Sequence, residues 1–342
     1  MSLEEGLRRS VEWLTERKPS WGGFHMTTLV TGGAGFIGSH LCERLLTEMH
    51  EVVSLDSYDD FYDPSTKHEN LAPSRDHSRF QAVEGDIRDG SVLDALPEVD
   101  VIVHLAARAG VRPSIRNPAL YNAVNVGGTL SLLDFARRRG IHRFIYASSS
   151  SVYGNNEAVP FSESDRVDHP ISPYAATKKA GELLCHTYHH LHSIGVLCLR
   201  FFTVYGPRQR PDLAIHKFAR LMRRGEAVPM FGNGTTERDY TYVDDTLQGV
   251  LGAMRFLDQH PDTFEIVNLG ESRTVPLTEM IDTVARTLGV TPEIERLPMQ
   301  PGDAIRTFAD ITKAAHLFGY NPQTEFEEGV ERFVEWFVEH RS

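Results

Sequence analysis

From residue 26 onward, short apolar runs alternate with longer stretches in which apolar residues recur at helical spacing. The short runs, typical of buried strands, cover residues 27–31, 51–55, 79–84, 101–105, 142–147 and 195–200. The helical pattern follows a glycine-rich turn after residue 31 and returns over residues 91–96, 118–139 and 173–192. Strands that alternate with helices indicate βαβ units, and therefore a parallel sheet with helices on both faces.

After residue 201 the pattern is less regular, with proline, glycine and polar loops, as in many substrate-binding domains. We therefore expect an α/β protein with a Rossmann-type, doubly wound parallel sheet over residues 26–201. A smaller C-terminal substrate-binding domain is expected over residues 202–342, with some of its segments returning to the first domain. Residues 1–25 are expected to form a helical appendage, because residues 3–16 repeat the pattern of residues 326–339.

The chain has 342 residues, with 35 Lys+Arg against 47 Asp+Glu, so its formal net charge is −12. This acidic balance argues against a general nucleic-acid or membrane-surface binder, although a local basic pocket for a phosphate-bearing ligand is still allowed. No apolar run is long enough to cross a membrane. Three cysteines are too few for a disulfide framework and indicate reduced thiols in a cytoplasmic protein. The clustered histidines of residues 186–192 lack the partners of a metal site, so no metal is expected.

The first strand is joined to the first helix by the sequence GGAGFIG, residues 32–38. Gly32 permits the tight turn, Gly35 lets a pyrophosphate approach the backbone, and Gly38 lets the helix pack closely on the strand. Asp56 ends the second strand, where its carboxylate can accept hydrogen bonds from the ribose diol of an adenosine. A 2′-phosphate would meet that negative charge, so the motif predicts NAD rather than NADP.

Tyr174 and Lys178 lie four residues apart, on one face of a helix that begins at Pro173. A free phenol titrates at about 10, and a nearby ammonium favours the phenolate, which is then a base for a sugar hydroxyl. Such a pair is common by chance. Four consecutive serines, residues 148–151, however, follow the 142–147 strand at the edge where open α/β sheets bind ligands. We expect Ser149 to share the reacting oxygen with Tyr174.

These three motifs, GxxGxxG, the serine run before VYG, and YxxxK, together resemble the extended short-chain dehydrogenase/reductase superfamily, in its sugar-nucleotide epimerase branch. The resemblance covers about residues 28–335 and implies bound NAD and a homodimer formed through the helices near 118–139 and 173–193. It implies Ser149, Tyr174 and Lys178 as catalytic residues. It implies cofactor contacts from Gly32, Gly35, Phe36, Ile37, Gly38, Asp56, Asp86, Ile87, Leu105, Ala106, Ala107, Tyr174 and Lys178. For Asp86, a structural cap is an equally good interpretation.

Two segments, residues 106–114 and 199–214, are similar to UDP-glucuronate 4-epimerases. In that family the threonine of FFTVYGP and the arginine three residues beyond its proline hold the sugar carboxylate, which implies Thr203 and Arg210 here. A guanidinium suits this role because it can bind a carboxylate through two hydrogen bonds. Arg208 stands close enough to compete with Arg210. The substrate contacts implied by the resemblance are Arg112, Ser149, Ser150, Thr203, Arg210, Arg238 and Asp303.

The resemblance implies an isomerase that inverts C4 of a UDP-sugar, UDP-glucuronate to UDP-galacturonate, through a transient 4-keto intermediate. The main alternative is a UDP-glucose/UDP-galactose 4-epimerase. Dehydratases of the branch carry Asp-Glu, and decarboxylases Glu, just before VYG. Ser150 and Ser151 occupy those places here and make both reactions less favoured. A non-catalytic NAD-binding regulator is the remaining alternative, and the intact Ser149, Tyr174 and Lys178 argue against it.

Overall fold

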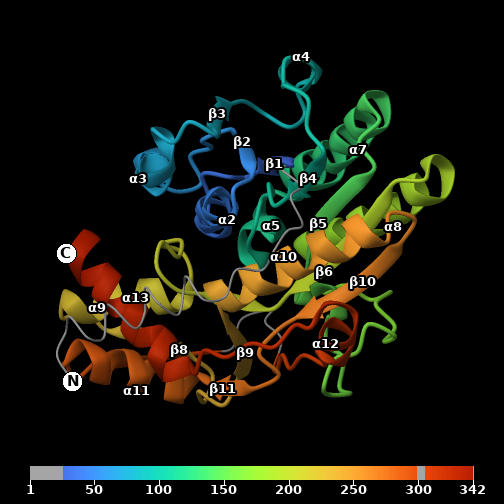
Figure 1. Ribbon diagram of the computed structural model, residues 1–342. Helices are drawn as coiled ribbons and strands as arrows, with labels where there is room; N and C mark the ends of the chain where they lie inside the picture. The colour runs from blue at the N-terminus through green and yellow to red at the C-terminus, as the bar shows by residue number, and fades with distance from the viewer. Residues whose placement is uncertain (1–25, 299–304, 342) are drawn as a thin grey trace.

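The computed structural model describes residues 26–298 and 305–341, and its centre is a seven-stranded parallel sheet (Figure 1). The strands lie in the order β10-β6-β5-β4-β1-β2-β3. The first six along the chain are β1 (Thr27–Thr31), β2 (Glu51–Asp56), β3 (Phe80–Glu84), β4 (Val101–His104), β5 (Arg143–Ser149) and β6 (Gly195–Phe201). Each lies within two residues of a predicted run, and the Rossmann-type fold class is confirmed. The helical appendage expected over residues 1–25 falls outside the described residues.

Most helices of this first part follow the predicted pattern. The structure contains α2 (Phe36–Thr47), α4 (Gly90–Asp94) and α8 (Pro173–His192). The helix predicted over 118–139 is present in three consecutive pieces, α6 (Pro118–Tyr121), the π-helical turn η1 (Asn122–Gly127) and α7 (Gly128–Arg139). The pattern missed α3 (Pro64–Arg75) because the buried side of that helix carries polar residues, Lys67 and Asn70 among them, instead of an apolar stripe. The short α5 (Val111–Arg116) and the 3-10 turn η2 (Ser150–Tyr153) were also not predicted.

Both faces of the sheet are covered. In β1 the side chains of Leu29 and Val30 point to opposite faces, and both are fully buried, as expected for a central parallel strand. Val30 belongs to the apolar cluster that includes Leu41 and Leu45 of α2. Leu29 belongs to the cluster on the other face, which includes Phe135 of α7 and residues of β4, β5 and β6. The sheet therefore presents only its ends and loops to ligands.

The chain after residue 201 is more regular than its sequence suggested. It forms a three-stranded sheet in the order β11-β9-β7 and a two-stranded sheet of β12 and β8. These strands are β7 (Thr203–Tyr205), β8 (Val228–Phe231), β9 (Glu237–Tyr242), β11 (Thr274–Pro276) and β12 (Ile294–Leu297). The helices are α9 (Ala214–Arg223), α10 (Val243–Gln259), α11 (Leu277–Leu288), α12 (Thr312–Phe318) and α13 (Phe326–His340). The prolines and glycines fall mostly between these elements. Their frequency therefore suggested irregular structure where regular helices and strands are present.

One segment of this second part joins the main sheet. β10 (Phe264–Leu269) pairs in parallel with β6 over six residues and forms the edge of the seven-stranded sheet. α10, which precedes it, supplies Val250 and Met254 to the same apolar cluster as α2. The smaller sheets and α9, α11 and α13 lie to one side of the large sheet, beyond the carboxyl ends of its strands (Figure 1). Loops from both parts therefore converge there.

Candidate active site

A cleft of about 520 Å³ lies at the carboxyl ends of the strands. All the cofactor residues implied by the sequence line it, from the glycine turn and α2 through the ends of β2 and β4 to the start of α8. Ser149, Ser150, Thr203 and Arg210 line it as well. Arg112 and Arg238 line a second cleft of about 380 Å³, which shares Gly110, Val111, Thr203, Asp212 and Leu213 with the first. Asp303 falls outside the described residues.

The glycine turn adopts a backbone that side chains would obstruct. Gly32 has φ +71°, in the left-handed region that favours glycine. A Cβ added at Gly38 would lie 2.2 Å from the carbonyl oxygen of Gly32. Gly35 begins α2 without any side-chain cap for the first helical N–H groups. The cleft therefore receives a helix N-terminus with free donors and positive dipole, which fits a pyrophosphate.

Asp56 is held in a fixed orientation at the end of β2 and is 6% exposed. Its carboxylate accepts hydrogen bonds from the backbone N–H of Ala34 at 3.2 Å and of Tyr58 at 2.9 Å. The ammonium of Lys67 lies 3.0 Å from Oδ1. Lys67 was not a predicted site residue because α3 itself was not predicted. Three donors hold the Asp56 carboxylate in place. Its remaining lone pairs therefore point in a fixed direction, as recognition of a ribose diol requires.

Asp86 has its own partner. Its carboxylate binds the guanidinium of Arg88 through both oxygens, with the shortest N–O distance 2.5 Å, and this pairing lowers the pKa of the carboxyl. Asp86 also accepts a hydrogen bond from the backbone N–H of Arg88. Both interpretations from the sequence are thus compatible with its place: the residue fixes the local turn and lines the cleft.

The Tyr174 backbone is fixed by the start of α8. Pro173 occupies the first turn, and Ser172 caps the helix by accepting from the N–H of Ala175 at 3.1 Å. The N–H of Tyr174 donates to the Oγ of Ser114 at 3.1 Å. The phenol lies against Ser149: burial raises its pKa, and a hydrogen bond with Ser149 and the positive charge of Arg210 oppose that rise.

Lys178 lies one turn further along α8 and is 4% exposed. Its Nζ donates a hydrogen bond of 2.7 Å to the carbonyl oxygen of Ala147, beside the serine run, and lies 6.0 Å from the centre of the Tyr174 ring. Burial lowers the pKa of Lys178 to about 8, against the opposing effect of nearby negative groups. At neutral pH the amine therefore carries its charge next to the phenol, as the sequence argument required.

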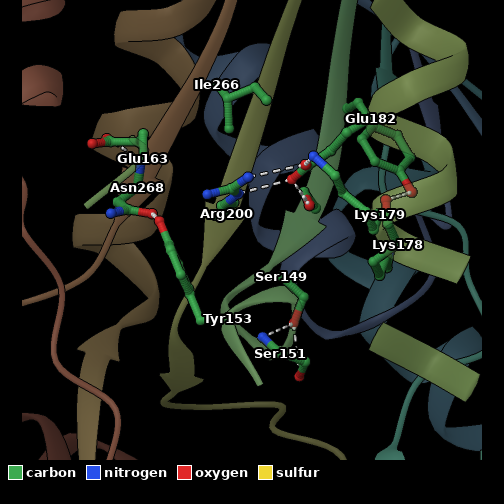
Figure 2. Close-up of polar contacts among 12 residues, drawn as sticks. Ser149, Ser151, Tyr153, Glu163, Lys178, Lys179, Glu182, Arg200, Ile266 and Asn268 are labelled. Atoms are coloured by element: carbon green, nitrogen blue, oxygen red, sulfur yellow. Dashed lines mark hydrogen bonds and ion pairs between the residues drawn. The ribbon is translucent and has the colours of Figure 1, made fainter. Parts of the chain in front are cut away.

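A buried ion pair joins Glu182 of α8 to Arg200 of β6, beside the serine run (Figure 2). Glu182 and Arg200 are each 1% exposed, and the guanidinium binds the carboxylate at 2.9 and 3.1 Å. Ser148 donates its hydroxyl to the same carboxylate at 2.6 Å, and Lys179 reaches it at 3.2 Å. Because Ser148 adjoins Ser149 and Glu182 follows Lys178 by four residues, this network fixes α8, which carries Tyr174 and Lys178, against β5, which carries Ser149.

The loop after β4 is fixed by a residue that the sequence argument missed. Asn125, in the π-helical turn, accepts from the N–H of Arg108 at 2.7 Å and donates to the carbonyl of the same residue at 3.0 Å. Its amide also donates to Thr177 of α8 at 3.0 Å. Asn125 therefore ties a wall of the cleft to the helix that carries Tyr174. An isolated asparagine within an expected helix gave no signal for this role.

The two candidate arginines for a sugar carboxylate are separated by the structure. Arg210 lines the cleft and packs over the ring of Phe61, 5.7 Å from its centre. Arg208 lines neither cleft and is directed to α2, where its Nη1 lies 2.7 Å from Glu43. Of these two arginines, Arg210 is therefore the one that a ligand in the cleft can reach. Phe61 and Asp212, which binds Arg210, are further cleft residues that the sequence argument missed.

Fold and cleft together define a dinucleotide-binding enzyme with a Ser-Tyr-Lys set at its centre. The model of the NAD dependent epimerase/dehydratase family matches residues 28–270. The chain belongs to this family, which confirms the expected superfamily branch and the expected NAD cofactor. The glycine turn, the helix N-terminus and the oriented Asp56 fit that cofactor.

Individual relatives are similar over nearly the whole chain. A probable UDP-glucuronate 4-epimerase of Rhizobium meliloti is 40% identical over 331 residues, 91% of this chain and 97% of the relative. The crystal structure of UDP-glucuronic acid 4-epimerase from Bacillus cereus, in complex with UDP-glucuronic acid and NAD, matches with a TM-score of 0.87 and 36% identity, covering 92% of this chain and 99% of that one. A UDP-glucose 4-epimerase from Thermotoga maritima matches with a TM-score of 0.84 and 32% identity, covering 93% and 100%.

Over residues 26–298 and 305–341, no group of three or more His, Cys, Asp or Glu side chains is placed to hold a metal ion. No helix in the same residues has the length and apolar character needed to span a membrane.

Proposed function

We propose that the protein interconverts UDP-glucuronate and UDP-galacturonate by inverting C4 of the sugar, with NAD retained through the cycle. The observation that carries the proposal is one cleft that contains the NAD-binding glycine turn, Tyr174, Lys178 and Arg210. The relatives named for UDP-glucuronate support the same substrate. Arg210 provides the physical reason, because a neutral sugar has no carboxylate for its partly buried guanidinium to bind.

In the proposed mechanism Tyr174 removes the proton of the C4 hydroxyl, and Ser149 hydrogen-bonds to the same oxygen. The ammonium of Lys178 stabilises the phenolate, since it lies 6.0 Å from the centre of the ring. Bound NAD supplies the hydride acceptor and, after the sugar has turned, the hydride donor. Tyr174 then returns the proton to the new alcohol. The redox change cancels over one cycle, so the cofactor is not consumed.

The remaining substrate roles are assigned by position. Arg112 and Arg238 line the second cleft and would neutralise the UDP phosphates, while Thr203 lines both clefts and would contact the sugar. Thr203 and Arg210 together would hold the carboxylate. This grip matters because the 4-keto intermediate is a β-keto acid that loses CO₂ when its carboxylate rotates freely.

The test is to incubate the purified protein with UDP-glucuronate and to follow UDP-galacturonate by NMR. We expect conversion to an equilibrium mixture, and a much slower reaction with UDP-glucose. Arg210→Ala is expected to reduce turnover of UDP-glucuronate severely and to leave any turnover of UDP-glucose unchanged. Absence of UDP-galacturonate with UDP-glucuronate would contradict the proposal, and equal loss with both sugars would favour the neutral-sugar alternative.

The protein is further proposed to be a cytoplasmic homodimer. Three leucines support the dimer because they are exposed on the helices expected at the interface: Leu130 on α7 is 42% exposed, and Leu183 and Leu191 on α8 are 58% and 63% exposed. The three free, buried cysteines support a reducing compartment. Light scattering should give the mass of two chains, and Leu183→Glu should give that of one; a wild-type monomer would contradict the dimer.

A further inference from the structure

We propose that Asp212 is a positioning residue that sets the orientation of Arg210, so that the guanidinium holds the carboxylate of the sugar in the plane that prevents decarboxylation. This inference rests on the proposed function, because it concerns the carboxylate of a uronate substrate. It extends that function by assigning the control of CO₂ loss to a residue that need not touch the substrate.

The contacts of Arg210 carry the inference. Its Nε lies 2.9 Å from Oδ1 of Asp212, and its Nη2 lies 2.9 Å from Oδ2, which is a two-pronged carboxylate–guanidinium pair. The ring of Phe61 packs against one face of the same guanidinium. Among the described residues Nη1 has no hydrogen-bond partner. The guanidinium is thus held by one edge and one face, and its remaining edge is available to a ligand in the cleft that Arg210 lines.

The chain between the two residues favours this pair. Arg210 and Asp212 lie two residues apart in a turn, so the guanidinium and the carboxylate come from the same short loop. Pro211 stands between them and fixes its own φ, so little conformational freedom is lost when the pair forms. The N–H of Leu213 also donates to the carbonyl of Arg210 at 3.1 Å. The orientation of the guanidinium therefore exists before any substrate binds.

The charges indicate that the pair serves to orient the guanidinium of Arg210. Burial disfavours the charged form of both groups, but their pairing outweighs it, so the pKa of Arg210 is raised, the pKa of Asp212 is lowered, and both are ionised at neutral pH. A sugar carboxylate then meets an arginine whose charge is already balanced. Asp212 reduces the long-range attraction of the site for an anion. What it provides is a rigid donor edge, and rigidity matters for the 4-keto intermediate.

The side reaction that this edge prevents is decarboxylation of the 4-keto intermediate. The C4 hydride passes to NAD, and the hydroxyl proton passes to Tyr174. The bond between C5 and the carboxylate then breaks, CO₂ leaves, and its electron pair forms an enolate that is protonated at C5. The products are a UDP-4-keto-pentose, CO₂ and NADH. Because the hydride cannot return to the original sugar, each such event leaves one reduced cofactor that absorbs at a wavelength where NAD does not.

The test compares Asp212→Asn with Asp168→Asn as a matched control. Asp168 pairs with Arg166 at 2.8 Å across the same two-residue spacing, and neither residue lines either cleft. Each variant and the wild type are incubated with UDP-glucuronate, and the ratio of CO₂ and NADH formed to UDP-galacturonate formed is measured. We expect this ratio to rise about tenfold in Asp212→Asn, the order given by losing one charge-assisted hydrogen bond, and to stay at the wild-type value in Asp168→Asn.

The outcomes separate this inference from the proposed function. A wild type that forms no UDP-galacturonate would refute the function itself. A wild type that epimerises, with an unchanged ratio in a folded Asp212→Asn, would overturn only the role of Asp212. A lower KM for UDP-glucuronate with an unchanged ratio would overturn it too, because Asp212 would then compete with the substrate for Arg210. Melting temperatures establish that both variants fold, and Asp212→Ala, which lacks every acceptor, is expected to raise the ratio further.

Discussion

Replacing Glu182 by methionine should strongly destabilise the protein. The carboxylate is 1% exposed and accepts four hydrogen bonds, from Ser148, Lys179 and two nitrogens of Arg200. Methionine fills a similar volume but offers no charge and no comparable acceptor. Arg200, also 1% exposed, would keep a buried cation without its counter-charge.

The size of the effect follows from that burial. Breaking a buried pair by removing one partner costs about 3–5 kcal/mol. With an unfolding entropy of about 2.1 cal/mol/K per residue, a chain of 342 residues loses about 4–7 °C of melting temperature. The double variant Glu182→Met/Arg200→Met should recover most of this loss, because replacing a whole buried pair by apolar side chains is often neutral. Its kcat should nevertheless fall, since Ser148 and α8, the helix that carries Tyr174 and Lys178, no longer share a hydrogen-bond partner.

The assay is calorimetry on the wild type, both single variants and the double variant, with Arg332→Met as a control. Arg332 pairs with Glu328 on the surface, where the two side chains are 46% and 50% exposed. Removing such a pair costs less than about 1 kcal/mol. If Glu182→Met melts no lower than Arg332→Met, or if the double variant is as unstable as the sum of the single variants, the reasoning is wrong.

Three further predictions concern the cleft. Tyr174→Phe should lower kcat by a factor of about 10² to 10⁴ and leave NAD bound, as measured by turnover and by cofactor released on denaturation; undiminished turnover would exclude the phenol as the base. Gly38→Ala should yield protein with little NAD, because its Cβ would lie 2.2 Å from the carbonyl oxygen of Gly32, and full occupancy would contradict the packing argument. Burial lowers the pKa of His104 to about 3, so the stability provided by its neutral ring is complete above about pH 6.5 and falls as the pH falls toward 3. Melting curves from pH 7 to pH 5 should therefore show the wild type losing about 2 kcal/mol relative to His104→Gln, whereas parallel curves would refute this assignment.

The core of the fold was predictable because its signals are local. Apolar runs identified the strands from β1 to β6, and Pro173 identified the start of α8, since strand burial and helix capping act within a few residues. α3 was missed because its buried side carries Lys67 and Asn70, which bind Asp56 and the backbone of Ala34. No periodicity reveals a helix buried through polar contacts.

The site residues also divide into those that local sequence signals predict and those that only the folded structure reveals. Gly38, Asp56 and Tyr174 belong to motifs with fixed spacing, so their common cleft follows from the order of the strands. Asn125 and Asp212 belong to no motif. Their hydrogen-bond partners can be identified only once the folded structure shows which side chains and backbone groups meet. The choice between Arg208 and Arg210 also depended on the third dimension, because the two lie two residues apart and are directed to different elements.

The most direct test of the proposed mechanism follows the hydrogen on C4. UDP-glucuronate labelled with deuterium at C4 is incubated with the protein in ordinary water, without added NAD, and the UDP-galacturonate is analysed by NMR. If the hydride moves to retained NAD and returns to the same sugar, the product keeps the deuterium at C4. Loss of the deuterium to water would contradict the mechanism.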